Sequence, residues 1–84
     1  METKVGEVDD FFGKVSVAAF KVVSEFAIGD TIHIKGHTTD FTQTVDSMQI
    51  DRKDVQKAAP GDSVGIKAKD KVRKGDTIFK VTAD

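Results

Sequence analysis

The sequence predicts an all-β domain, a closed six-stranded Greek-key barrel with one short helical turn. The chain lacks Leu, and its apolar residues are mainly Val, Ile and Phe, which suit the pleated surface of a sheet. The dipeptide Gly-Asp occurs at residues 29–30, 61–62 and 75–76, and a run rich in β-branched residues follows each time. Apolar and polar residues alternate in these runs with the two-residue period of a half-buried strand.

The strands are predicted in order from this alternation and from the turn signals between them. They cover residues 5–12, 15–23, 31–35, 42–51, 64–69 and 77–81. We expect residues 1–4 to fray and the whole chain, 1–84, to form a single domain.

Three irregularities are predicted within this pattern. Asp9-Asp10 interrupts the first strand and indicates a bulge there. The second strand is apolar on both faces, which favours a second bulge near Ala18-Ala19. Residues 54–58 predict one helical turn with Asp54 as its N-cap, ended by Pro60.

Composition excludes several classes of function. The net charge of −1 gives the whole chain no strong attraction to nucleic acid or to an anionic membrane. The absence of Cys excludes disulfides and thiolate metal sites, and it fits a reducing compartment, so we expect a cytoplasmic protein. No apolar run is long enough for a signal peptide or a membrane span, and we expect no membrane partner.

Two motifs invite a catalytic or metal-binding interpretation. Gly61-Asp62-Ser63-Val64-Gly65 matches the Gly-x-Ser-x-Gly nucleophile elbow, but a strand follows this serine where the elbow requires a helix. His33 and His37, with Asp40 as a third ligand, are weighed against two exposed polar histidines, and the second interpretation is favoured. No phosphate-binding loop is present. We therefore expect no enzyme activity, cofactor, metal or small-molecule substrate.

The charge is unevenly distributed along the chain. Residues 1–50 carry four lysines against eight acidic residues, whereas residues 51–84 carry nine Lys and Arg against six Asp. The densest basic run spans residues 67–74, and two interpretations stay open: lysines that protect a sheet edge, or side chains that contact phosphates. Phe41 could stack on a base. The RNA-binding candidates are Lys67, Lys69, Arg73 and Lys74.

The chain also resembles a known family over residues 5–81, the β-barrel second domain of translational GTPases such as elongation factor Tu. The resemblance is carried by the segments Ile28–Ile32, Val45–Gln49, Gly61-Asp62, Val64–Ile66 and Val72–Asp76, together with Val55 and Ala58. The segment Ile34–Thr42 looks similar to small stand-alone elongation-factor-like proteins, and also to the barrel appended to some collagenase-like peptidases.

The resemblance implies a non-enzymatic module of translation that contacts RNA or a ribonucleoprotein such as the ribosome through its basic face. The alternative is a protein-interaction module that serves a separately encoded peptidase or GTPase.

Overall fold

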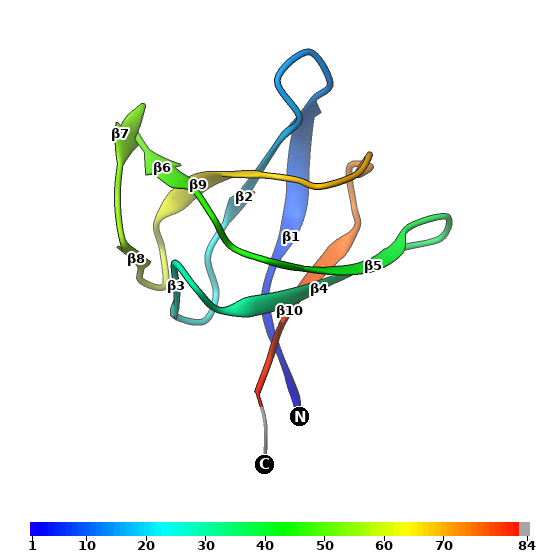
Figure 1. Ribbon diagram of the computed structural model, residues 1–84, viewed down its shortest axis with the longest axis horizontal. Coiled ribbons are helices and arrows are strands. Elements are labelled where there is room, and N and C mark those ends of the chain that lie inside the picture. The colour runs from blue at the N-terminus through cyan, green and yellow to red at the C-terminus, as the bar shows by residue number, and fades with distance from the viewer. Residues whose placement is uncertain (83–84) are drawn as a thin grey trace.

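Strands alone make up the regular structure of residues 1–82, the part of the chain described by this computed structural model (Figure 1). The strands are β1 (Glu2–Phe12), β2 (Val17–Lys21), β3 (Phe26–Ala27), β4 (Thr31–Lys35), β5 (Asp40–Thr44), β6 (Met48–Ile50), β7 (Lys53–Asp54), β8 (Lys57–Ala58), β9 (Ser63–Lys67) and β10 (Thr77–Val81). The all-β prediction is confirmed. Residues 1–82 contain no helix with the length and apolar character needed to cross a membrane.

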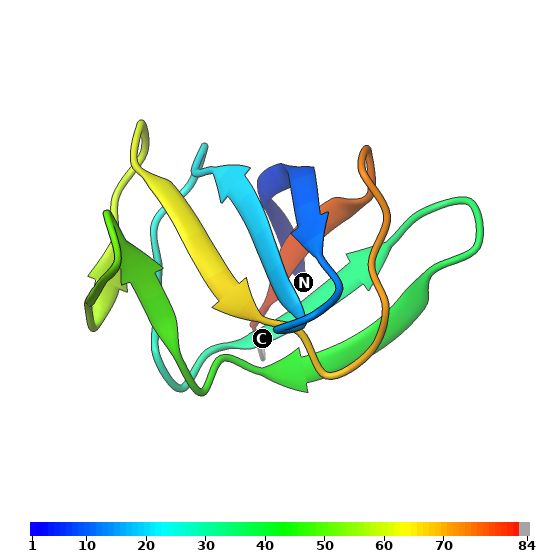
Figure 2. The same cartoon turned by 90° about the horizontal axis from the view of Figure 1, so that it is seen from above.

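Eight strands form one antiparallel sheet in the order β5-β4-β10-β1-β2-β9-β6-β7, and β3 pairs with β8 beside it. β1 belongs to both halves of this sheet, because its first half pairs with β10 and its second half with β2. The strands curve around a common interior (Figure 2). Residues 1–4, for which we predict fraying, include Glu2, which pairs with Val81.

The prediction of a closed barrel is wrong. β5 and β7 end the sheet on its two sides, and no backbone ladder joins them among residues 1–82. The cause lies in the predicted strand at 42–51, which is broken into β5 and β6. The β4–β5 ladder ends at Val45: its N–H still donates to the carbonyl of Asp30 (2.9 Å), but its carbonyl accepts the N–H of Gly29 (2.9 Å), because the N–H of Asp30 turns back to Ala27.

The predicted helical turn at 54–58 is also wrong. β7 ends at Asp54, β8 covers Lys57–Ala58, and the backbone groups of the two residues between them bond to other segments of the chain. The N–H of Val55 donates to the carbonyl of Met48 (3.0 Å), and the carbonyl of Gln56 accepts from Ile28 (2.9 Å). The pairing of Phe26 with Ala58 then buries both residues in the core.

One of the two predicted bulges is present. The register of β1 against β2 shifts between Val8 and Asp10, at the acidic pair. The bulge predicted near Ala18-Ala19 is wrong, because β2 pairs with β9 in an unbroken register. β2 instead keeps Ala18 and Phe20 in the core and leaves Ala19 half-buried on its outer face.

The three Gly-Asp turns share one construction. The Asp N–H donates to the carbonyl three residues earlier, and the Asp carboxylate accepts the N–H of that same residue. The glycines have φ of 94° to 96°, which suits the third position of a type II turn. The paired residues are Ala27 with Asp30, Ala59 with Asp62, and Arg73 with Asp76.

The interior of the sheet is filled by apolar side chains from nearly every strand. The buried apolar residues are Val5, Val8, Ala18, Phe20, Val22, Phe26, Ile32, Ile34, Val45, Met48, Ala58, Val64, Ile66, Ala68, Val72 and Ile78. This core fixes which side chains of β5 and β9 face outward, and several of those side chains line the candidate site.

Candidate functional site

We use the name seam for the line along which the edge of β5 faces residues 67–73. Gln43 crosses it: its Nε2 donates to the carbonyl of Lys67 (2.8 Å), and its Oε1 accepts the N–H of Lys69 (2.6 Å). The side-chain amide thus takes the place of a peptide group from a neighbouring strand. Gln43 is not among the residues predicted from the sequence. Its signal was a polar residue at an inward position of an alternating strand, between Phe41 and Val45.

Two hollows open along the seam. The larger has a volume of about 650 Å³ and is lined by Thr31, Thr42, Gln43, Thr44, Asp46, Lys67 and Lys69. The smaller has a volume of about 300 Å³ and is lined by Thr38, Thr39, Asp40, Phe41, Asp70, Lys71 and Arg73. Most of these side chains are polar, so both hollows suit a polar or charged ligand better than an apolar one.

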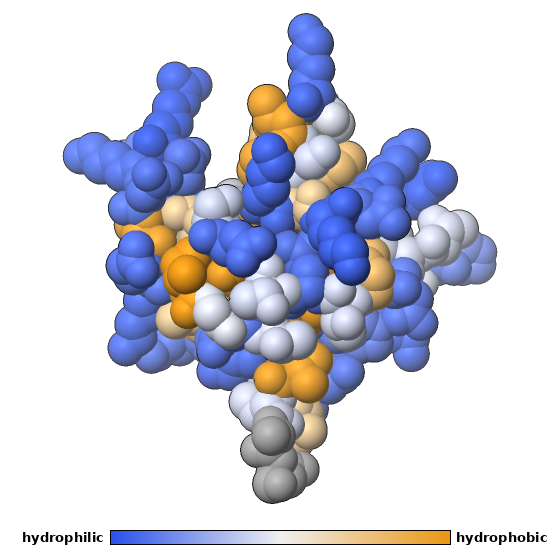
Figure 3. All heavy atoms as spheres, viewed as in Figure 1, coloured by the Kyte–Doolittle hydropathy of each residue, from blue (hydrophilic) through white to orange (hydrophobic). Residues whose placement is uncertain are grey.

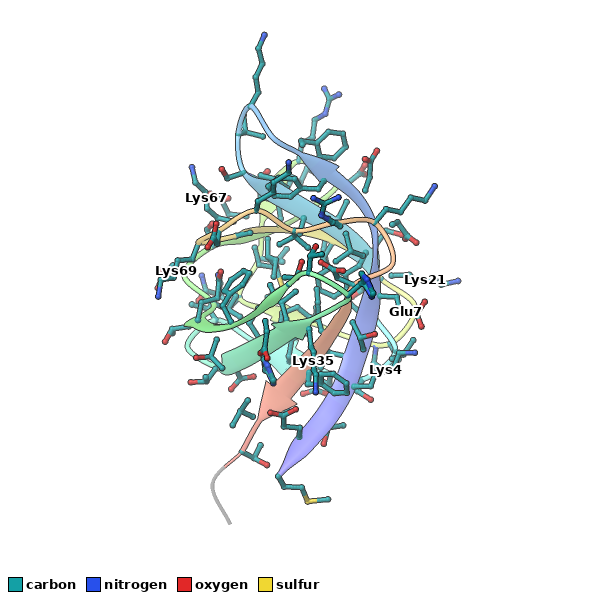
Figure 4. All side chains as sticks on the ribbon, turned by 90° about the vertical axis from the view of Figure 1, so that its right-hand side faces the viewer. Lys4, Glu7, Lys21, Lys35, Lys67 and Lys69 are labelled. Carbon is teal, nitrogen blue, oxygen red and sulfur yellow. The ribbon has the colours of Figure 1, made fainter. Side chains whose placement is uncertain are left out.

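The structure brings together some of the predicted RNA-binding residues. Lys67 and Lys69 are exposed, line the larger hollow and project on the same side of the molecule (Figure 4). Arg73 lines the smaller hollow, and Lys74 is exposed in the third Gly-Asp turn, outside both hollows. Phe41 is half-buried and packs against the core. RNA contact by these side chains stays a prediction.

His33 lies on the outer face of β4 between two carboxylates. Its Nδ1 is 2.8 Å from Oε2 of Glu2, and its Nε2 makes a short hydrogen bond to Asp40. The hydrogen bond to Asp40 raises the pKa of His33 above its usual range, with Glu2 adding to the effect. The same contact lowers the pKa of Asp40. The cluster therefore favours a protonated, positively charged His33.

The geometry around the two remaining motifs is simple. Ser63 is exposed at the start of β9, opposite Lys21 of β2. It lies on a strand after a turn, which is the arrangement that the sequence predicts. Across residues 1–82, no group of three or more His, Cys, Asp or Glu side chains is placed to hold a metal ion. His37 lies exposed in the loop after β4.

The connection between β1 and β2 carries exposed apolar side chains. Phe12 is 49% exposed and Val15 is 54% exposed, and the N–H of Val15 donates to the carbonyl of Phe12 (3.2 Å). Half-buried Val17 and Ala19 continue this surface along the outer face of β2. We call these four residues the tip strip. Figure 3 shows hydrophobic side chains reaching the surface below the tip of this protruding connection, at the top of the view.

Relatives of the chain among known proteins are proteases. It is 44% identical over 77 residues to an uncharacterized protease of Methanocaldococcus jannaschii, a match that covers 90% of this chain and 19% of that protein. It is 36% identical over 81 residues to a collagenase of Porphyromonas gingivalis, covering 94% of this chain and 22% of the collagenase. The chain thus spans about a fifth of the length of these curated relatives. No protein-family model matches it.

Two solved structures with the same fold are also of a domain of a peptidase. The C-terminal domain of a putative U32 peptidase of Geobacillus thermoleovorans superposes with a TM-score of 0.86 and 20% identity, covering 93% of this chain and 91% of that chain. Its selenomethionine variant gives a TM-score of 0.85 and 19% identity, covering 90% and 96%. These superpositions establish the likeness of fold.

The resemblance to the translation-factor barrel was wrong as an assignment of family and of a role in protein biosynthesis. The named relatives are a protease and a collagenase, and the solved neighbours are C-terminal domains of a U32 peptidase. The residues that carried the resemblance include the Gly-Asp turns and the alternating apolar positions, which determine the fold and not the function. The likeness of residues 34–42 to a barrel appended to collagenase-like peptidases points in the direction of these relatives.

Proposed function

We propose that this chain is a non-catalytic accessory module that works with a peptidase domain of the U32 type. The observation that carries the proposal is the 44% identity over 77 residues, which cover one fifth of the length of a named protease. The remaining four fifths of that relative leave ample chain for a separate catalytic domain. The lack of cysteine supports a cytoplasmic location for the module.

The non-catalytic role is supported by the chemistry of the described side chains. Ser63, in the one motif that suggests a nucleophile, is exposed on a strand. Both ring nitrogens of His33 are engaged by Glu2 and Asp40, on a different strand. A nucleophile needs a base within hydrogen-bonding reach, and Ser63 and His33 are not hydrogen-bonded to each other among residues 1–82.

The tip strip is the surface that we propose meets the peptidase domain. Its exposed apolar side chains protrude from the sheet and continue onto half-buried residues of β2. Contiguous exposed apolar surface of this kind marks interaction sites more often than scattered single residues do. Asp9 and Arg52 lie beside it and supply a polar rim, as in protein interfaces.

The proposal is tested by mixing this chain with the purified four fifths of the M. jannaschii relative that lie outside the match. We expect binding by calorimetry with a Kd in the micromolar range or tighter, since inter-domain interfaces resemble transient protein complexes. Phe12→Ser/Val15→Ser should weaken it about tenfold or more. Val23→Ser is the matched control, because Val23 is equally exposed but lies outside the tip strip.

Two outcomes would contradict the proposal. The first is no heat of binding at any attainable concentration, with both proteins folded. The second is hydrolysis of casein by this chain alone, lost in Ser63→Ala, which would make the chain an enzyme.

A further inference from the structure

We infer that the seam binds an extended acidic peptide, which adds a strand to the edge of β5 and places its carboxylates on Lys67 and Lys69. This gives the accessory module a ligand: a stretch of unfolded polypeptide held for the peptidase. Only that use rests on the proposed function. The binding itself is a property of this chain alone.

The free edge of β5 supplies the backbone groups. β5 pairs with β4 on one side and ends the sheet on the other, within the described part of the chain. The N–H of Val45 donates to the carbonyl of Asp30 in β5–β4 register. Hydrogen-bonded pairs alternate along an antiparallel ladder, so Gln43, two residues earlier, also bonds to β4, whereas Thr42 and Thr44 do not. The N–H and carbonyl groups of Thr42 and Thr44 therefore point toward the seam. Both threonines line the larger hollow.

The width of the seam suits one added strand. Gln43 reaches from β5 and pairs with the backbone of Lys67 and Lys69. The two backbones are bridged here by a side chain and not by a direct ladder, so they lie farther apart than two paired strands do. Gln43 crosses this space, so a strand that pairs with both Thr42 and Thr44 must displace the Gln43 amide from Lys67 and Lys69. The hollow beside it holds about 650 Å³, room for an extended segment to lie against β5.

The charges along the seam favour acidic residues in the ligand. Lys67 and Lys69 are exposed, and no hydrogen bond or ion pair found in residues 1–82 engages either ammonium group. Lys67 ends β9, Lys69 follows it by two residues, and both line the same hollow. Side chains on one face of an extended peptide repeat every two residues, about 6.6–6.8 Å. Acidic residues at alternate positions can therefore meet both lysines. Asp46, in the same hollow, disfavours a carboxylate at its own position.

A peptide fits this edge better than a nucleic acid does. The edge of β5 presents N–H donors together with carbonyl acceptors, and a peptide strand satisfies both, as in strand addition to other sheets. The phosphate groups of a nucleic acid offer no donor for the carbonyls of Thr42 and Thr44, and only sugar hydroxyls or base edges could supply one. Asp40, Asp46 and Asp70, which also lie in the hollows, disfavour phosphates and carboxylates alike, so the choice between the two ligands rests on the backbone groups of β5.

The test uses the purified chain and fluorescein-labelled peptides of eight residues. The first consists of four Glu-Thr repeats, the second of four Lys-Thr repeats, and the third of four Glu-Pro repeats. The third keeps the acidic charge but loses half of its backbone donors. We expect fluorescence anisotropy to show the Glu-Thr peptide binding at least tenfold tighter than the other two, because binding needs both charge and strand pairing.

Variants locate the site. Lys67→Gln/Lys69→Gln should weaken binding of the Glu-Thr peptide about tenfold. Lys14→Gln/Lys53→Gln removes the same charge from other parts of the surface and should change the affinity for the Glu-Thr peptide by no more than about twofold. In the wild type, the peptide should slow hydrogen exchange at the amides of Thr42 and Thr44, because an added strand covers these groups.

Several results would overturn the inference. One is no binding of the Glu-Thr peptide up to about 1 mM, the weak end of measurable affinity. Another is equal binding of the Glu-Pro peptide, which would mean charge attraction without strand addition. A third is tighter binding of a labelled uridine decamer, which would assign the seam to RNA. None of these depends on docking to a peptidase domain, so the failure of one proposal is distinguishable from that of the other.

Discussion

Gly65 shows how a single missing side chain shapes the outer face of the sheet. It lies on β9 opposite Ala19, and a Cβ atom built on it would approach Cγ1 of Val17 to 3.0 Å. That distance is tight for a methyl group and too tight for a branched side chain. The neighbouring side chain of β2, and not a strained backbone, is therefore what favours glycine here.

Gly65→Val should destabilise the protein by roughly 1–3 kcal/mol, because the added methyl groups overpack the contact with Val17. Urea unfolding of the wild type and the variant measures this. The double variant Gly65→Val/Val17→Ala should recover part of the loss, since it removes the opposing methyl groups. Equal urea midpoints for the wild type and Gly65→Val would show that the contact does not limit the side chain.

His33 makes stability depend on pH, and the two partners act in opposite ranges. Its pKa is raised in the folded state, so its contribution is complete below about pH 6.5 and is lost as the pH rises through the raised value. The pKa of Asp40 is lowered, so its contribution is complete above its usual value and is lost as the pH falls through the lowered one. Both contributions are present together in mildly acidic solution.

We expect the urea midpoint of the wild type to fall between about pH 6 and pH 9, as His33 loses its proton. His33→Gln should flatten this fall, because glutamine bonds to carboxylates without a charge. His37→Gln is the control, because His37 is exposed in a loop. Parallel pH profiles for the wild type and His33→Gln would assign the pH dependence to other groups.

At the scale of elements, the Gly-Asp turns repeat one device at three places with different burial. The hydrogen bonds of Asp30 and Asp76 to backbone N–H groups are partly buried, whereas that of Asp62 is exposed. Asp76 is 4% exposed as a residue. A donor left without a partner costs more when water cannot reach it. The three turns should therefore differ in their importance for stability.

Asp30→Ala and Asp76→Ala should each cost roughly 1–3 kcal/mol, and Asp62→Ala roughly 0.5–1.5 kcal/mol. Asn at each position keeps an acceptor oxygen and should recover much of the loss. Thermal or urea unfolding of the six variants gives the order. A larger loss for Asp62→Ala than for Asp76→Ala would contradict the argument from burial.

The sequence predicts elements well where a local pattern decides them. The turns at 29–30, 61–62 and 75–76 need only Gly for φ and Asp for its carboxylate, and alternation in 31–35 places Ile32 and Ile34 inward, where both are fully buried. The prediction of a helical turn at 54–58 is wrong because the backbone groups of this segment bond to residues outside it, such as Met48 and Ile28. The role of Gln43 could not be predicted from a local pattern either, because its hydrogen-bond partners lie more than twenty residues away in the sequence.

For the whole molecule, Gln43 decides how the two sides of the open sheet are held together. Its amide makes two hydrogen bonds across the seam, where no strand pairing exists in the described chain. The sheet is thus joined by one side chain at this point. Such a join is weaker than a ladder, and we expect it to open locally before the rest of the fold does.

Gln43→Ala should lower stability by roughly 1–2 kcal/mol and speed hydrogen exchange at the amide of Lys69, which loses its acceptor. Gln43→Glu keeps an acceptor for the N–H of Lys69 but loses the donor to the carbonyl of Lys67. Its stability should therefore lie between that of the wild type and that of Gln43→Ala. Gln49→Ala is the control, because Gln49 bonds to Asp54 at the surface and crosses no seam. Unchanged exchange at Lys69 in Gln43→Ala would mean that other contacts hold the seam.

The place of β10 in the sheet has a consequence for the order in which the chain is assembled. The last strand made lies between β1, the first, and β4. During synthesis β1 and β4 therefore leave the ribosome with a gap between them, and each exposes an edge until residues 77–81 arrive. Loop closure over nearly the whole chain then completes the sheet, and contacts of such long range form slowly. A nascent chain stalled before Thr77 should accordingly be sensitive to protease. A nascent chain in which residues 77–81 have left the ribosome should be resistant.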